Sequence, residues 1–144
     1  MPEGEVFIQL IIKRKLLSST KNMFAGCSDL GSISIHGLDI RKINSMDGMF
    51  TNCTSLISLS LGTVKPPSHR ISFNRMFENN INLKELDLSS FDTSNVENMK
   101  EIFSGYNKLK SIKFSDKFIT DKIKYMSGMF KGNLSLEELN LSFF

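Results

Sequence analysis

The stretch MFENNINLKELDL occupies residues 76–88, and its pattern recurs along the chain. Its leading dipeptide appears five times, once with Ile for Met, as Met23-Phe24, Met49-Phe50, Met76-Phe77, Ile102-Phe103 and Met129-Phe130. The steps between these copies are 26, 27, 26 and 27 residues. Taking the first residue of each pair as position 0, leucine always stands at position 7, as Leu30, Leu56, Leu83, Leu109 and Leu136. Such regularity indicates one structural unit used repeatedly.

Each unit combines a part with helical spacing and a part with strand spacing. The helical part is illustrated by residues three, three, one, three and three apart, namely Ile43, Met46, Met49, Phe50, Cys53 and Leu56. Ser94 stands three residues before Glu97, the spacing of a capping box at the start of a helix. The Leu-x-Leu triplet that follows has period two and predicts a short strand. We therefore expect an α/β solenoid with a parallel β-sheet on one face and short helical segments on the other.

The chain of 144 residues has room for one domain. We expect a single domain over residues 1–144, divided into a leading strand with a partial repeat (1–22), full repeats (23–48, 49–75, 76–101, 102–128) and a truncated repeat (129–144). Residues 6–12 form the expected leading strand. One unit cannot bury both its Met-Phe face and its Leu-x-Leu face, whereas stacked units can. The Met-Phe stripe is therefore assigned to the core rather than to a cofactor site.

The pattern Asp92-Thr93-Ser94-Asn95-Val96-Glu97-Asn98-Met99, then Met-Phe, then Cys or Asn, then Leu-x-x-Leu-x-Leu-Ser, resembles the leucine-rich repeats of BspA-like surface proteins of bacteria and some parasitic protists. The resemblance covers residues 17–144. It implies a curved leucine-rich-repeat solenoid at the cell surface that binds host or matrix proteins. The pattern is broken by Ile102, Tyr106 and Arg70, and we expect Ile71 to take the core place that Arg70 cannot fill.

The residues that face away from the core in the predicted strands form the candidate protein-binding face. The central row contains Ser34, Ser60, Asp87, Lys113 and Asn140. The row two residues earlier contains Ser32, Ser58, Glu85, Ser111 and Glu138, and the row two residues later contains His36, Gly62, Ser89, Ser115 and Ser142. These rows contain no Trp, Tyr, Phe or Arg, so we expect weak polar contacts that gain strength by repetition. The alternative is a purely structural segment with no ligand of its own.

The sequence predicts neither an enzyme nor a metal or cofactor site. It lacks a Gly-x-Ser-x-Gly elbow, a His-Glu-x-x-His motif and a phosphate-binding glycine loop, and its two histidines lie far apart in phase. Cys27 and Cys53 share position 4 with Asn80, Tyr106 and Asn133. We expect buried free thiols there, and asparagines that satisfy backbone groups.

Charge argues against nucleic acid as a partner. The formal net charge is +3, and the eight lysines of residues 100–131, set against three acidic residues, are typical of a solvated surface because no arginine or exposed aromatic residue accompanies them. The apolar run 6–12 is too short for a membrane span, which takes about 20 residues, and its acidic start does not fit a secretory signal. We expect no membrane insertion. The resemblance implies a cell-surface or secreted location, and a complete chain without a signal would be cytoplasmic.

The last repeat provides a second possible contact. Leu139, Leu141 and Phe144 are expected beside an unpaired strand edge, which is a template for further pairing. The partners predicted from the sequence are therefore a host or matrix protein, or another copy through the C-terminal end.

Overall fold

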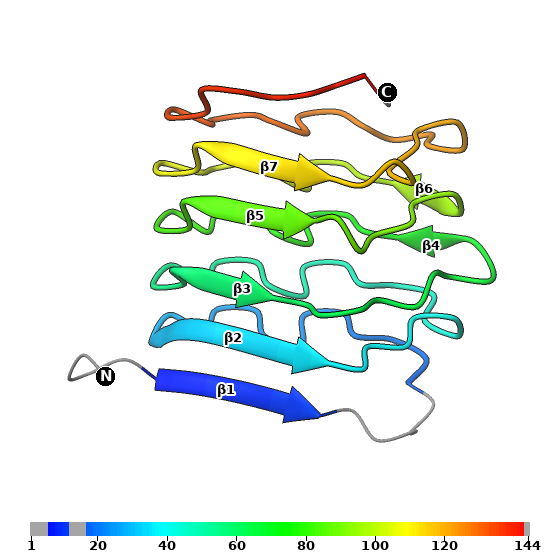
Figure 1. Ribbon diagram of the computed structural model, residues 1–144, viewed down its shortest axis with the longest axis horizontal. Helices are drawn as coiled ribbons and strands as arrows, with labels where there is room; N and C mark the ends of the chain where they lie inside the picture. Colours follow the sequence, from blue (N-terminus) through cyan, green and yellow to red (C-terminus); the bar gives the residue numbers. More distant parts are fainter. Residues whose placement is uncertain (1–5, 12–16, 143–144) are drawn as a thin grey trace.

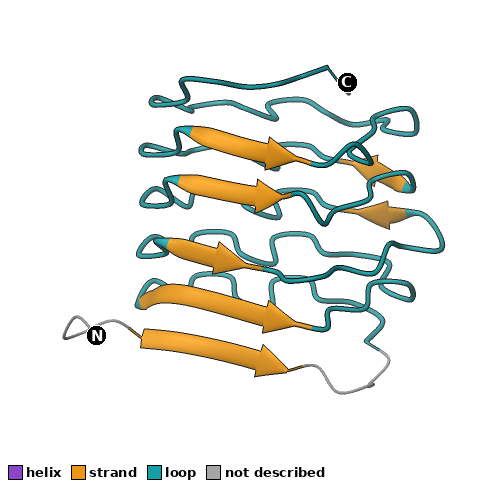
Figure 2. Ribbon diagram, in the orientation of Figure 1, coloured by secondary structure: helices purple, strands orange, loops and turns teal. Residues whose placement is uncertain are grey.

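Short strands and tight turns make up the computed structural model, which describes residues 6–11 and 17–142. The strands are β1 (Val6–Ile11), β2 (Leu30–His36), β3 (Ser58–Ser60), β4 (Ile71–Ser72), β5 (Glu85–Leu88), β6 (Val96–Asn98) and β7 (Ser111–Phe114). β1, β2, β3, β5 and β7 follow one another along one side of the molecule, while β4 and β6 lie on another side (Figure 1). Figure 2 shows strands and loops in the described residues, and none of these residues is helical.

The strands pair in parallel within three small sheets. β1, β2 and β3 form one sheet in that order, and the pairs β4–β6 and β5–β7 form the other two. Ile33 pairs with Leu59 and Leu86 pairs with Ile112, so the register follows the repeat. Within the described chain β3 and β5 are not hydrogen-bonded into one sheet. The expected continuous sheet is therefore interrupted between the second and third units.

In place of the expected helical segments, the structure has a series of tight turns around each Met-Phe pair, which we call a turn run. In every unit φ is positive at position −1 and again at position 3. The first set is Asn22, Gly48, Arg75, Glu101 and Gly128, and the second is Gly26, Asn52, Asn79, Gly105 and Gly132. A right-handed helix needs negative φ at each residue, so a left-handed residue every four positions ends the helical path at each turn. The prediction of a leucine-rich-repeat solenoid with one parallel sheet and helical segments is therefore wrong, as is the capping box, because residues 96–98 form β6.

Backbone hydrogen bonds join the turn runs of neighbouring units, and we call this array the turn ladder. Here each unit is counted from position −4, so that the residues just before a Met-Phe pair belong to the same unit as that pair. N–H groups at positions −3, −1, 1 and 3 donate to carbonyls at positions −4, −2, 0 and 2 of the next unit. Between the second and third units, Met46, Gly48, Phe50 and Asn52 donate to Ser72, Asn74, Met76 and Glu78. The same four bonds occur at all four junctions, from Thr20–Ser45 to Gly105–Lys131, with N···O distances of 2.7–3.2 Å. Each unit is thereby fixed in register on its neighbour.

The core lies between the turn runs and the strands. The rings at position 1 stack with centroid distances of 5.4, 5.8, 6.1 and 5.5 Å, in the order Phe24, Phe50, Phe77, Phe103 and Phe130. Met46 and Met49 are fully buried, which confirms that the Met-Phe stripe packs in the core of the inner units, whereas Met23 and Met126 in the outer units are exposed. Ile71 is buried beside exposed Arg70, as expected. β1 confirms the leading strand over residues 6–11, while Ile12 and Phe144 lie outside the described residues.

Candidate protein-binding face

The strands β2, β3, β5 and β7 direct alternate side chains outward, where the candidate face was predicted. Along β2 the inward Ile33 and Ile35 are buried, while Ser32 and Ser34, which alternate with them, are half-buried. The other residues of the central and earlier rows are exposed, namely Ser58, Ser60, Glu85, Asp87, Ser111, Lys113, Glu138 and Asn140. In the later row Ser115 is half-buried and the other four residues are exposed. Glu138 is joined to Ser111 by an isolated parallel bridge, and Asn140 follows it outside any named strand.

The break between β3 and β5 divides the face into a neutral half and a charged half. In the neutral half Ser32 pairs with Ser58 and Ser34 pairs with Ser60. Ser34 Oγ also lies 3.2 Å from His36 Nε2. Serine hydroxyls both donate and accept, so this half offers hydrogen bonds without fixed charge.

The charged half lies on β5, β7 and the unit that follows. Asp87 pairs in register with Lys113, and Lys113 Nζ lies 3.4 Å from Asp87 Oδ2. Lys110 Nζ forms a second bridge of 2.9 Å to Glu137 Oε1. Hydrogen bonds from Ser89, and then the charge of Lys113, lower the pKa of Asp87. Each of these two ion pairs therefore joins opposite charges on neighbouring units.

Position 8 adds residues that the sequence reasoning missed. It is held by Gly31, Ile57, Lys84, Lys110 and Glu137. Ile57 is 50% exposed beside the neutral half, and the ion pair between Lys110 and Glu137 borders the charged half. The sequence did contain a sign of this role, because position 8 holds glycine, isoleucine, lysine and glutamate in different units, and a position buried in every unit would not accept charged residues.

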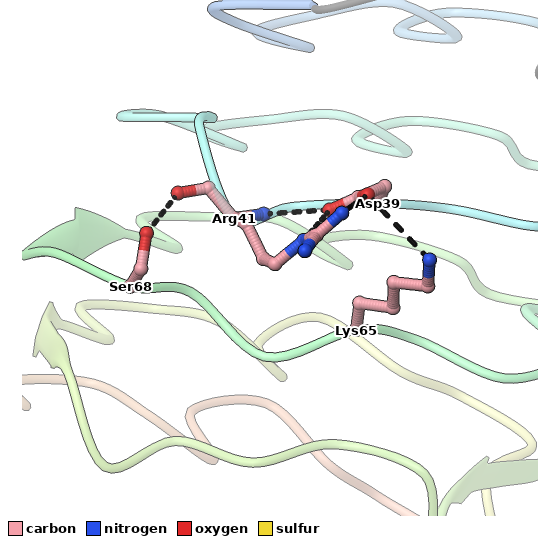
Figure 3. A network of polar contacts seen from close by, with 4 residues as sticks. All are labelled: Asp39, Arg41, Lys65 and Ser68. Atoms are coloured by element: carbon pink, nitrogen blue, oxygen red, sulfur yellow. Dashed lines mark hydrogen bonds and ion pairs between the residues drawn. The ribbon is translucent and has the colours of Figure 1, made fainter. Parts of the chain in front are cut away.

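A second polar cluster, also not predicted, follows β2 and joins the first and second units (Figure 3). Arg41 Nη2 lies 2.6 Å from Asp39 Oδ2, and Arg41 Nε donates to Asp39 Oδ1 at 2.9 Å. Lys65 Nζ approaches the same carboxylate at 3.8 Å, and Ser68 Oγ donates to Arg41 O at 2.6 Å. The hydrogen-bonded Arg41 guanidinium lowers the pKa of Asp39 to about 2. Each of the four residues forms a hydrogen bond or an ion pair with another member of the cluster, so the cluster links the two units.

Side chains at position 4 donate hydrogen bonds to backbone carbonyls of the turn runs. Cys53 Sγ donates to Phe24 O at 3.1 Å, and Asn80 Nδ2 donates to Phe50 O at 3.0 Å. Asn133 Nδ2 donates to Phe103 O at 2.8 Å. The predicted role of these asparagines is confirmed, and both cysteines are free, Cys53 buried and Cys27 half-buried. Burial raises the pKa of Cys53 to about 11, which disfavours the reactive thiolate.

In residues 6–11 and 17–142 no three His, Cys, Asp or Glu side chains gather in a way that could hold a metal ion. The same residues include no helix that is long and apolar enough to span a bilayer.

Comparison with known proteins identifies a family but no individual relative. Searches of the curated proteins and of the solved structures found no significant match. The family described as "Mycoplasma protein of unknown function, DUF285" matches residues 18–143, which include all five turn runs and the outward rows. The match does not confirm the finer resemblance to BspA-like repeats. The chain belongs to the DUF285 family.

Proposed function

We propose that this chain is a non-enzymatic protein-binding module that acts at the cell surface and contacts a host or matrix protein through the outward strand face. The observation that carries the proposal is the register of the outward side chains. Ser34 stands beside Ser60, and Asp87 stands beside Lys113. Repeated side chains in register offer several similar contacts to one partner, and linked weak contacts gain affinity together. The resemblance to BspA-like surface proteins supports the location and the partner class.

A protein suits this face better than a nucleic acid does. The charged half carries three lysines against four carboxylates, namely Lys84, Lys110 and Lys113 against Glu85, Asp87, Glu137 and Glu138. This balance does not favour a phosphate backbone, which is bound by excess positive charge. Exposed ion pairs contribute little to stability. The bridge between Lys113 and Asp87 can therefore break at little cost, and each residue can then pair with an opposite charge on a partner. Ile57 supplies an exposed apolar contact beside the serines.

The test measures binding of the full chain to a panel of immobilised, purified extracellular matrix proteins. The double variant Ser34→Arg/Ser60→Arg places bulky charge on the neutral half, and Asp87→Ala/Lys113→Ala removes the charges of the other half. Lys42→Ala is the control, since Lys42 is exposed in a turn outside the face. We expect at least one matrix protein to bind, with the affinity reduced about tenfold by the variants of the half that it contacts, as for the loss of about 1.4 kcal/mol.

The proposal fails if no matrix protein binds, or if the Lys42→Ala chain and the face variants bind equally well. The first result would favour the purely structural segment, and the second would place the contact elsewhere. Circular dichroism of each variant verifies that the fold is retained.

A further inference from the structure

The strand face lacks hydrogen bonds at one of the four junctions between units. At the other three junctions the N–H group at position 8 donates to the position 8 carbonyl of the preceding unit. These donor–acceptor pairs are Ile57–Gly31 and Lys110–Lys84, each at 2.8 Å, and Glu137–Lys110 at 3.2 Å. At the junction between the second and third units, the Lys84 N–H group has no backbone acceptor within residues 6–11 and 17–142. β3 and β5 are neighbours on the strand side (Figure 1), yet they do not pair.

The turn side of the same junction is fully bonded. The turn ladder is complete there, with N···O distances of 2.9–3.0 Å. Two side-chain hydrogen bonds reinforce it, from Asn79 Nδ2 to Asn52 Oδ1 at 2.7 Å and from Asn82 Nδ2 to Thr54 O at 2.8 Å. The second and third units are therefore fixed to each other along the turn runs, while their strands are not joined.

The inward residue of β3 is less covered than its equivalents in the other strands. Leu59 at position 10 is half-buried against the core, whereas Ile33, Leu86 and Ile112 at the same position are 1%, 2% and 6% exposed. Ile57, two residues before Leu59, is 50% exposed. Neighbouring strands normally cover such side chains, so the exposure of Leu59 follows from the separation of β3 and β5.

We propose that the junction between the second and third units is a hinge, with the turn ladder as its axis and with β3 and β5 as the two edges that open and close. The structure is that of the open state. In the closed state β3 and β5 pair in the register that β2–β3 and β5–β7 share, which places Ser58 beside Glu85, Leu59 beside Leu86 and Ser60 beside Asp87. Closing forms strand hydrogen bonds and buries Leu59, and opening returns these groups to water.

The hinge sets the angle between the two halves of the strand face. The break between β3 and β5 is also the boundary between the neutral half and the charged half. A partner that contacts both halves favours the state that fits it, by as much as its affinities for the two states differ. This coupling rests on the proposed function, whereas the hinge is a property of the free chain. The experiment uses the free chain, so failure here and failure of matrix binding are distinguishable.

Methyl NMR of the full chain, labelled with ¹³C at Ile and Leu methyl groups, follows the hinge. We expect the Leu59 methyl groups to exchange between a half-buried and a buried environment. Exchange within microseconds to milliseconds gives relaxation dispersion, and slower exchange gives two peaks. Ile33 and Ile112 lie at the same position of strands that are hydrogen-bonded, so they should show no such exchange.

Charge substitutions at Ser58 shift the hinge in opposite directions. Ser58 is exposed and lies closest to Glu85 in the closed state. Opposite charges on paired strands attract and like charges repel, so we expect Ser58→Lys to raise the ratio of closed to open chains about threefold and Ser58→Glu to lower it about threefold. If the exchange is faster than microseconds, the Leu59 methyl signals move in opposite directions in these two variants.

Ser111→Lys is the matched control for the Ser58 variants. Ser111 pairs with the same Glu85, but across the hydrogen-bonded junction between β5 and β7. The substitution therefore brings the same charge to Glu85 without crossing the hinge. We expect it to change the ratio of closed to open chains by less than about 1.5-fold, because cross-strand charge pairs act between directly opposite residues.

Three results would overturn the proposal. The first is a Leu59 signal with neither exchange nor opposite shifts in the two Ser58 variants. The second is equal exchange at Ile33 and Ile112, which would indicate a general motion of the strand face. The third is a change of the same sign for Ser58→Lys and Ser58→Glu, or an equal change for Ser58→Lys and Ser111→Lys.

Discussion

The third and fifth units have the same apolar pattern but bury it differently. Phe73 and Leu88 in the third unit are 1% exposed, while Met126 and Leu141 at the same positions of the fifth unit are 43% and 44% exposed. The third unit has a neighbour on both sides, whereas the described residues cover the fifth unit on one side only. The repeat pattern therefore specifies one layer, and the burial of that layer depends on the layers next to it.

Hydrogen exchange gives the largest expected contrast between inner and outer units. The amides of Gly48 and Asn52 donate to the third unit, while those of Gly128 and Gly132 have no acceptor in the described chain. We expect the inner pair to exchange at least about 1,000-fold more slowly, because opening it requires loss of packed structure. Residue-resolved exchange by NMR measures this, and similar rates for both pairs would contradict the comparison.

Truncation of an inner ring tests the packing of the third unit. Phe77 is 1% exposed and stacks between Phe50 and Phe103. We expect Phe77→Ala to lower the free energy of unfolding by about 3–5 kcal/mol, as for large buried aromatic residues. Asp87→Ala on the exposed face should change it by less than about 0.5 kcal/mol. Denaturant titrations compare the two variants, and the opposite ranking would refute the assignment of inside and outside.

The same substitution in two units isolates the effect of the neighbour. Met46 is fully buried and Met126 is 43% exposed at the equivalent position. We expect Met46→Ala to cost about 2–4 kcal/mol and Met126→Ala less than about 1 kcal/mol. Equal losses in thermal or chemical unfolding would show that the fifth unit is as well packed as the second.

The smallest expected effect concerns the ion pair that links the first two units. The pKa of Asp39 is about 2 in the folded protein, below the ordinary value of 3.8. The stabilisation by this ion pair is therefore present above pH 4 and is lost as the pH falls toward 2. Because Asp39 is 35% exposed, solvent screening limits Asp39→Asn to a loss of about 1 kcal/mol or less near pH 7. Unfolding curves of both proteins should converge near pH 2, and a difference that grew on acidification would contradict the assigned pairing.

The sequence predicted the core and the outward rows because both follow from position in the repeat. Ile71, Asn80 and Asn133 have the predicted roles. The helical segments were wrong because spacings of three and four residues suit tight turns as well as helices. Position 3 held the missed signal, since Gly or Asn, the residues that most readily adopt positive φ, occupies it in all five units.

Two further features were beyond sequence reasoning for a different reason. Arg75 and Glu101 have φ of 54° although neither residue favours it, and their side chains pair with each other at 2.6 Å. The separation of β3 from β5 likewise depends on backbone hydrogen bonds, which side-chain periodicity does not report.

The turn ladder also has a net dipole. All its N–H groups point toward higher-numbered units, so their peptide dipoles add along the stacking axis of this side. In an α-helix such dipoles add along the chain, whereas here they add across it, from one unit to the next. In parallel strand pairs the bonds run both ways and contribute little. Among the described residues, partial positive charge therefore lies at the N–H groups of Met126, Gly128 and Gly132, and partial negative charge lies at the carbonyls of Ser19, Lys21 and Met23.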